Sequence, residues 1–174
     1  MKAVADASSL IHPAKIPKFW SLMKQTFSEI LIPEAVYREI LKGREIGSPD
    51  VPVIEGDVAR GWIKVRKVKV RLRLPDNLGM GEKEAINLMG EGGADWLLMD
   101  DRVASMIARL MGMKVRSSVY LLIFWRRKGM IDREEALELL DSLVEAGYHL
   151  SSKDYVTVKK HLSLSSEKLG IGKI

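Results

Sequence analysis

The sequence predicts an α/β fold in which helices cover a central, mostly parallel sheet. Short apolar runs typical of buried strands alternate with helical patterns along most of the chain. The length of 174 residues suits one domain with a hydrophobic core, and the hydrophobic fraction of 47% is ordinary for a globular protein. We therefore expect a single domain over residues 1–174, with the helical patterns after about residue 130 forming an extension packed on it.

The first part of the chain alternates strand and helix patterns. Pro33 is well placed as the first residue of a helix, and Gly43 is well placed to close it. The stretch over 44–56 is rich in Gly and Pro and is expected to be a loop. The elements before that loop are, in order, a strand over 3–5, a turn at Ser8 and Ser9, a helix over 20–27, an apolar run over 30–32 and the helix over 33–43.

The alternation continues to the end of the chain. Ile63 and Val65 alternate with basic residues, and the parity then slips at Arg66 and Lys67, which predicts a strand, a turn or bulge, and a second extended segment over 68–74. The later elements are, in order, a helix over 81–93, a strand over 96–99, a helix over 100–112, a short strand over 113–117, and helices over 118–129, 132–147 and 151–162.

Acidic side chains follow two of the predicted strands. Asp6 follows the first strand, and Asp100 and Asp101 follow the strand over 96–99. Ligands of parallel sheets gather at the carboxyl ends of the strands, so these acids are expected to meet at one edge. Adjacent carboxylates repel by roughly 1 kcal/mol in water. Solvent, a helix N-terminus, a basic side chain or a metal ion must offset that repulsion.

Two further acids, Glu39 and Glu82, border helix faces that are expected to be buried. Each acid also has an ordinary structural interpretation. Glu82 suits the positive end of a helix dipole, Asp100 is a plausible N-cap of the helix that follows it, and Asp101 favours the same helix start. Glu39 could pair with Lys42 or Arg38 on the surface. Taken together, the acids could instead converge on a divalent cation.

Any metal ion would be bound mainly by oxygen. Cysteine is absent, so no thiolate site is possible. His12, His149 and His161 are far apart in sequence and lack the spacing of a helical zinc pair. Oxygen ligands favour a hard cation, Mg²⁺ or Mn²⁺.

The composition indicates the kind of partner, the source and the cellular location to expect. A net charge of +5 suits a polyanionic partner, although the signal alone is weak. Gln25 is the only glutamine, and with few other amides and no cysteine this hints at a thermophilic source. No apolar run reaches the roughly 18 residues of a membrane span, and Asp6 comes before any signal-peptide core could form, so we expect a cytoplasmic protein.

The ordered set of motifs resembles the PIN-domain nucleases over nearly the whole chain. An apolar strand leads into Asp6-Ala7-Ser8, and "LIPEAVYREI" places an acid in a helix that follows a proline. "GEKEAI" opens a helix with an acid, and "LLMDDRVA" is a strand followed by aspartates. The chain looks most similar to an uncharacterised prokaryotic subgroup near the toxin ribonucleases. The resemblance implies a three-layer α/β/α fold.

The resemblance also implies site residues. Asp6 and Asp100 match the first and last metal-binding aspartates of the family, and Glu39 and Glu82 match its second and third acids. The implied metal ligands are Asp6, Glu82 and Asp100. Ser8 matches the hydroxyl that supports the first aspartate.

Asp101 would be an auxiliary acid, and two features depart from the family pattern. The third acid is Glu82 rather than the usual aspartate, and its extra methylene would move the carboxylate. Glu84 and Glu34 stand close enough in sequence to compete with the assignments of Glu82 and Glu39.

The activity implied is metal-dependent endonucleolytic cleavage of single-stranded RNA. The resemblance makes an antitoxin protein an expected partner, and a homodimer the expected assembly; a concentration-independent monomer would refute the latter. Two alternatives stay open. One is a PIN-like module that binds RNA or protein without cutting, and the other is a phosphohydrolase acting on nucleotides or DNA flaps.

RNA would need basic residues around an acidic site. Candidates are Lys15, Lys18, Arg102, Arg116 and the ladder from Lys64 to Arg73. For the ladder, the sequence slightly favours a solvated strand whose lysines guard a sheet edge over RNA binding. The segment over 118–129 is better read as a buried helix or dimer face than as an aromatic platform for bases.

Overall fold

The computed structural model describes residues 1–69 and 71–164, which divide into two compact units. The first unit spans Met1–Ser117 and holds the sheet, and the second begins at Ser118 and is helical where it is described. Every acid predicted for the site belongs to the first unit. The expectation that both units form a single domain stays a prediction.

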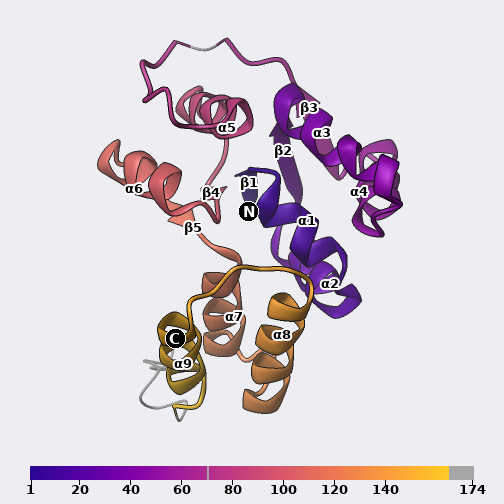
Figure 1. The fold of residues 1–174 in the computed structure, drawn as a ribbon, viewed down its shortest axis with the longest axis vertical. Helices are drawn as coiled ribbons and strands as arrows, with labels where there is room; N and C mark the ends of the chain where they lie inside the picture. Colours follow the sequence, from indigo (N-terminus) through magenta and orange to yellow (C-terminus); the bar gives the residue numbers. More distant parts are fainter. Residues whose placement is uncertain (70, 165–174) are drawn as a thin grey trace. The chain divides into compact units, whose positions relative to one another are not determined.

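The sheet is parallel, with the strand order β3-β2-β1-β4-β5 (Figure 1). The strands are β1 (Lys2–Ala5), β2 (Glu29–Pro33), β3 (Ile63–Arg66), β4 (Trp96–Leu98) and β5 (Val115–Arg116). In the register, Val4 of β1 pairs with Leu31 of β2 and with Leu97 of β4. The inner strands are continuous apolar runs because a parallel sheet is buried on both faces. The predicted parallel α/β fold is therefore confirmed.

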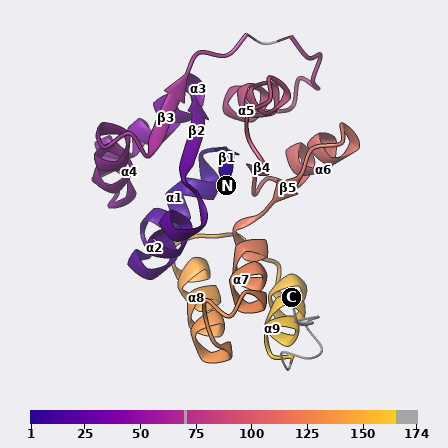
Figure 2. The ribbon, with the colours of Figure 1, turned by 180° about the vertical axis from the view of Figure 1, so that it is seen from behind.

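Helices cover this sheet in an α/β/α arrangement. They are α1 (Ser8–Ala14), α2 (Pro17–Thr26), α3 (Glu34–Leu41), the 3-10 helix η1 (Lys42–Ile46), α4 (Asp50–Ala59), α5 (Met80–Gly90) and α6 (Arg102–Leu110). α5 contacts β1, β2 and β4 and also packs on α3. Figure 2 shows α4 beside β3 and α6 beside β5, at the two ends of the sheet. The core beneath α5 includes Val4, Ile86 and Leu97, all fully buried.

The predicted turn at Ser8 and Ser9 and the predicted loop over 44–56 are wrong. Ser8 begins α1, and the stretch over 44–56 contains most of η1 and the first part of α4. Pro52 lies in the first turn of α4, where its missing N–H would have had no helical partner.

The predicted extended segment over 68–74 is not part of the sheet. β3 ends at Arg66, and the described residues 67–69 and 71–79 contain no strand. Val70 lies outside the described residues.

The second unit contains the three helices predicted for it: α7 (Ser118–Arg127), α8 (Arg133–Glu145) and α9 (Ser152–Leu162). Asp132 accepts a hydrogen bond from the Glu135 amide, and the Glu135 side chain accepts one from the Asp132 amide, which caps α8. Trp125 of α7 is completely buried, as a buried helix requires. None of the described helices is long and apolar enough to cross a membrane.

Candidate active site

The strand order reverses at β1, which lies between β2 and β4. In open α/β sheets, ligands bind outside the carboxyl ends of the strands at such a switch point. Asp6 follows β1 and Asp100 follows β4 by two residues, so the fold brings the two predicted aspartates to this point. The amide of Asp6 donates to the carbonyl of Leu98 at 3.1 Å, which ties the ends of the two strands together.

The side chain of Asp6 is buried and held by three donors. Its Oδ1 accepts from the Ser9 amide at 2.8 Å, in the first turn of α1. Its Oδ2 accepts from the Ser8 hydroxyl at 3.2 Å and from the Asp100 amide at 3.3 Å. Strand, aspartate and helix thus follow one another so closely that the carboxylate has one orientation.

The adjacent aspartates have different surroundings. Asp101 is the N-cap of α6, and its Oδ1 accepts from the Ala104 amide at 2.7 Å. The suggestion that Asp100 caps this helix is therefore wrong. Asp100 instead contributes its amide to Asp6. The helix N-terminus offsets the charge of Asp101.

Glu82 and Glu39 reach the same place from α5 and α3. Asp6, Glu39 and Glu82 line a small cavity of about 90 Å³ together with Ala7, Ser8 and Gly79. Glu82 also accepts a hydrogen bond from the Gly79 amide at 2.7 Å, which closes the start of α5.

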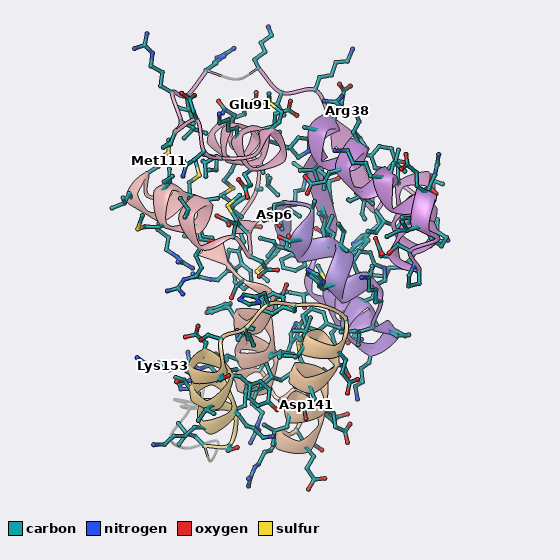
Figure 3. The ribbon with its side chains drawn as sticks, viewed as in Figure 1. Asp6, Arg38, Glu91, Met111, Asp141 and Lys153 are labelled. Carbon is teal, nitrogen blue, oxygen red and sulfur yellow. The ribbon has the colours of Figure 1, made fainter. Side chains whose placement is uncertain are left out.

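The close contact of α3 with α5 depends on Gly81. A Cβ at this position would lie 3.0 Å from Oε2 of Glu39 and 3.3 Å from Cγ2 of Val36. The missing side chain of Gly81 therefore leaves room for Glu39 beside the start of α5. Figure 3 labels Asp6 near the centre of the first unit and Arg38, the neighbour of Glu39 in sequence, on α3.

The competing glutamates have other partners. Glu84 accepts from the Ala35 amide at 3.1 Å and so caps α3 from α5. Glu34 pairs with Arg38 one turn later, at 3.8 Å. Neither lines the cavity, whereas Glu82 and Glu39 do, so the ambiguity left by the sequence has a structural answer.

The acids disfavour one another's charge. Burial, and then the charge of Asp100, raises the pKa of Asp6 from 3.8 to about 7, against the opposing hydrogen bonds from Ser9 and Asp100. Burial also raises the pKa of Glu82, followed by the charges of Asp101, Asp6 and Glu39. The lining of the cavity, as described, contains no lysine or arginine.

The donor set fits a hard divalent cation, since every charged group in the lining is a carboxylate. A cation would offset the repulsion that raises the pKa of Asp6 and Glu82. The distances between these side chains are less favourable for binding an ion. Within residues 1–69 and 71–164, no group of three His, Asp or Glu side chains stands close enough to hold an ion as the side chains lie.

The basic residues predicted from sequence lie elsewhere. Of the described residues that line the cavity, none is Lys15, Lys18, Arg102 or Arg116. The Arg116 guanidinium lies over the Trp96 ring at 5.3 Å and donates to the carbonyl of Val115 at 3.0 Å, which are structural contacts.

A second cavity with two basic residues adjoins the acidic one. It measures about 290 Å³, shares Glu39 with the acidic cavity, and includes Arg38 and Lys42 in its lining. Sequence reasoning considered these two side chains only as surface partners of Glu39. Arg38 lies on α3 and Lys42 is the residue that caps its C-terminal end, and this spacing of four residues was the signal that could have placed them beside Glu39.

Comparisons with known proteins identify the family. Residues 2–164 match the family model described as DUF3368: PIN domain. Among solved structures, the chain is similar to a PilT N-terminus domain protein from the hyperthermophilic archaeon Sulfolobus solfataricus P2, with 19% identity and a TM-score of 0.49 over 87% of this chain and 98% of that one. It is also similar to a domain of a functionally unknown protein from Methanocaldococcus jannaschii DSM 2661, with 21% identity and a TM-score of 0.46 over 67% of this chain and 89% of that one. No curated protein matches the chain significantly.

The parallel sheet and the acid-lined cavity at its switch point define an α/β protein with an acidic site at the carboxyl ends of its strands. The family match covers nearly the whole chain. The chain belongs to the PIN-domain family, whose members are generally nucleases.

Proposed function

We propose that this protein is a divalent-metal-dependent endoribonuclease that hydrolyses phosphodiester bonds in single-stranded RNA. The observation that carries the proposal is the cavity in which Asp6, Glu39 and Glu82 meet, with Asp100 beside Asp6. A phosphodiester is itself anionic, so these acids would repel it unless a cation lay between them. The same requirement explains why cavity acids with raised pKa values suit a metal-dependent hydrolase.

Each residue has a distinct role in this proposal. Asp6, Glu82 and Asp100 would hold Mg²⁺ or Mn²⁺. Such an ion supplies positive charge that activates the attacking water and stabilises the charge that develops on the phosphate. Ser8 and the Ser9 amide keep the Asp6 carboxylate in one orientation.

The two remaining acids, Asp101 and Glu39, have different roles: Asp101 positions the backbone, and Glu39 acts on the attacking water. Asp101 is engaged with the start of α6 and so holds the backbone of Asp100 in place. Glu39 is the cavity acid best suited to orient the attacking water, because it lines the cavity and is exposed to solvent.

The direct test is cleavage of a labelled single-stranded RNA in Mn²⁺ or Mg²⁺ by wild type, Asp6→Asn and Asp100→Asn. Loss of a metal ligand is expected to exceed the roughly 10–100-fold loss typical of residues that only support ligands. Asp76→Asn is the matched control, since Asp76 is a fully exposed acid of the same unit. Equal cleavage by wild type and both site variants would refute the proposal.

The substrate arms of the same assay test a rival hydrolase. Cleavage of a DNA flap or of a free nucleotide, without cleavage of single-stranded RNA, would assign the site to another phosphohydrolase reaction.

A non-catalytic binding module is the second candidate, and one observation favours it. No three acids or histidines among the described residues are grouped closely enough to hold an ion. Calorimetry with Mn²⁺ on wild type and Asp100→Asn separates the two functions. Binding lost in the variant supports the nuclease, whereas RNA binding without Mn²⁺ binding in either protein supports the module.

A finer proposal is that the protein is the toxin of a toxin–antitoxin pair, which the resemblance supports. Expression of wild type should then arrest growth of a host cell, and Asp6→Asn should not. Equal growth of both cultures would remove the toxin role while leaving the ribonuclease proposal in place.

A further inference from the structure

The basic ladder from Lys64 to Arg73 has two parts with different surroundings. Lys64 lies on β3 and pairs with Glu29 of β2. β3 is the last strand at its edge of the sheet and ends at Arg66. Because the described residues that follow form no strand, guarding a sheet edge explains the charges on β3 and not those beyond it. We call Lys67, Lys69, Arg71 and Arg73 the basic strip.

The basic strip is held on the protein by its apolar neighbours. Val68, Leu72 and Leu74 pack against the core cluster that includes residues of α5. The Cδ1 atom of Leu72 lies 3.5 Å from where a Cβ on Gly90 would be, so the segment contacts the end of α5 closely. These three apolar side chains therefore pack on the core, whereas the four basic side chains of the strip are exposed to solvent.

A buried amide fixes the middle of this segment. Oδ1 of Asn87 accepts from the amides of Arg71 and Leu72 at 2.8 and 2.9 Å, and its Nδ2 donates to the carbonyl of Lys83 at 2.8 Å. Asn87 is only 3% exposed. These hydrogen bonds satisfy the buried amide of Asn87 and hold the backbone of Arg71 and Leu72 against α5.

The four cations of the basic strip are exposed on one side of the segment and lack acidic partners. None of them forms an ion pair among residues 1–69 and 71–164. Four exposed like charges within the short segment over 67–73 suit a ligand with repeated negative charges. In Figure 3, long side chains with nitrogen ends extend outward from the connection between β3 and α5.

We propose that the basic strip binds phosphates of the single-stranded RNA that extends beyond the candidate active site. This proposal rests on the proposed ribonuclease function. Glu82 and Asn87 are both on α5, five residues apart, which is about 7.5 Å along the helix axis. An RNA strand leaving the acidic cavity along α5 meets the strip within a few nucleotides, so the strip favours long substrates over short ones.

The test compares a strip variant, Lys67→Gln with Lys69→Gln, Arg71→Gln and Arg73→Gln, with wild type. The matched control replaces four exposed basic residues of the second unit by glutamine and so removes the same charge: Arg127, Lys128, Lys153 and Lys160. Binding of labelled oligouridines of about 4 and about 16 nucleotides, which bracket common single-strand site sizes, is measured by fluorescence anisotropy in EDTA across a salt series.

For the longer oligouridine, the slope of log K against log salt is expected to become shallower by up to about 3 in the strip variant, because each phosphate contact on a single strand contributes about 0.7. The control variant should keep the wild-type slope. Cleavage of the shorter oligouridine in Mn²⁺ should be the same in all three proteins.

Failure of this proposal differs from failure of the proposed function. If wild type cleaves RNA but the strip and control variants have the same salt slope, the strip has no role and the nuclease assignment stands. If wild type neither binds nor cleaves either oligouridine, the proposed function fails and the strip proposal fails with it.

Discussion

Replacing Asp6 by asparagine is expected to stabilise the metal-free protein above neutral pH. Asp6 is 3% exposed, and burial, then the charge of Asp100, raises its pKa from 3.8 to about 7. The folded chain thus disfavours the ionised carboxylate. Asparagine has nearly the same shape and still accepts from the Ser9 amide through Oδ1, whereas its Nδ2 no longer accepts from the Ser8 hydroxyl or the Asp100 amide.

The sign and size of the change in the free energy of unfolding follow from its linkage to proton binding at Asp6. Because the folded-state pKa of Asp6 lies above the unfolded value, its contribution to the free energy of unfolding is intact below pH 3.8 and is lost as the pH rises to about 7. At about 1.4 kcal/mol per pH unit, that loss is about 4 kcal/mol, after which the contribution is constant. The asparagine variant has no such loss. An imperfect hydrogen bond to its amide could offset about 1 kcal/mol of the gain.

The assay is urea unfolding of wild type, Asp6→Asn and the control Asp76→Asn in EDTA from pH 4 to pH 8. The advantage of Asp6→Asn should be near zero at the acid end and grow until the pH passes about 7, while the control follows wild type. Adding Mn²⁺ at pH 8 should then stabilise wild type and the control Asp76→Asn, but not Asp6→Asn, by about 2.7 kcal/mol at a concentration 100 times the Kd. A difference between wild type and Asp6→Asn that does not change with pH would refute the reasoning.

Three further substitutions test the supports of the site. Ser8→Ala removes a hydrogen-bond donor to the Asp6 carboxylate and should weaken Mn²⁺ binding in calorimetry by about tenfold or more. An unchanged affinity for Mn²⁺ would exclude a supporting role for Ser8. Gly81→Ala places a carbon 3.0 Å from the flexible carboxylate of Glu39, so it should displace Glu39 and reduce cleavage while changing the free energy of unfolding by no more than about 1 kcal/mol. The comparison is Gly79→Ala, whose added carbon meets nothing closer than 3.5 Å, and equal cleavage by the two variants would contradict the close packing. Asp101→Ser should retain the N-cap, whereas Asp101→Ala should lose about 1 kcal/mol in guanidinium unfolding; equal stability of the two variants would show that the cap contributes nothing.

The proximity of Asp6 and Asp100 could be predicted because it depends only on locating two strands and on recognising that the sheet is parallel. The apolar runs over 3–5 and 96–99 correspond to β1 and β4 almost residue for residue. Once strands alternate with helices, the sheet is parallel and the carboxyl ends of its strands lie at one edge. The acids after those strands must then approach each other, whatever the loops do.

The helices α1 and α4 could not be predicted because local signals pointed the other way. Prolines and glycines usually mark turns and loops, and both helices contain proline. In α4, Pro52 falls in the first turn, where it removes no helical hydrogen bond. In α1, the Asp6 carboxylate binds the Ser9 amide, a contact that requires the end of β1 to be folded already.

The alternation of apolar and basic residues over 68–74 predicts a strand, but its physical cause is packing against the core and not pairing with a neighbouring strand. A period of two in burial indicates an extended chain lying on a surface, and a neighbouring strand is only the commonest such surface. Here the surface is the core beneath α5, and Asn87 supplies the hydrogen bonds that a sheet partner would have given. Nothing in the spacing of the sequence shows that an asparagine on a helix will serve that purpose.

The adjacent carboxylates of Asp100 and Asp101 can coexist because of the residue at which α6 begins. An N-cap side chain binds the amide three residues later, as Asp101 does with Ala104. If the helix began one residue earlier, Asp100 would cap it, and its amide would no longer be placed to donate to Asp6. The start of α6 at Arg102 therefore decides which aspartate the helix dipole stabilises. The other carboxylate remains beside Asp6 at the switch point, where a cation or protonation of Asp6 would relieve the repulsion.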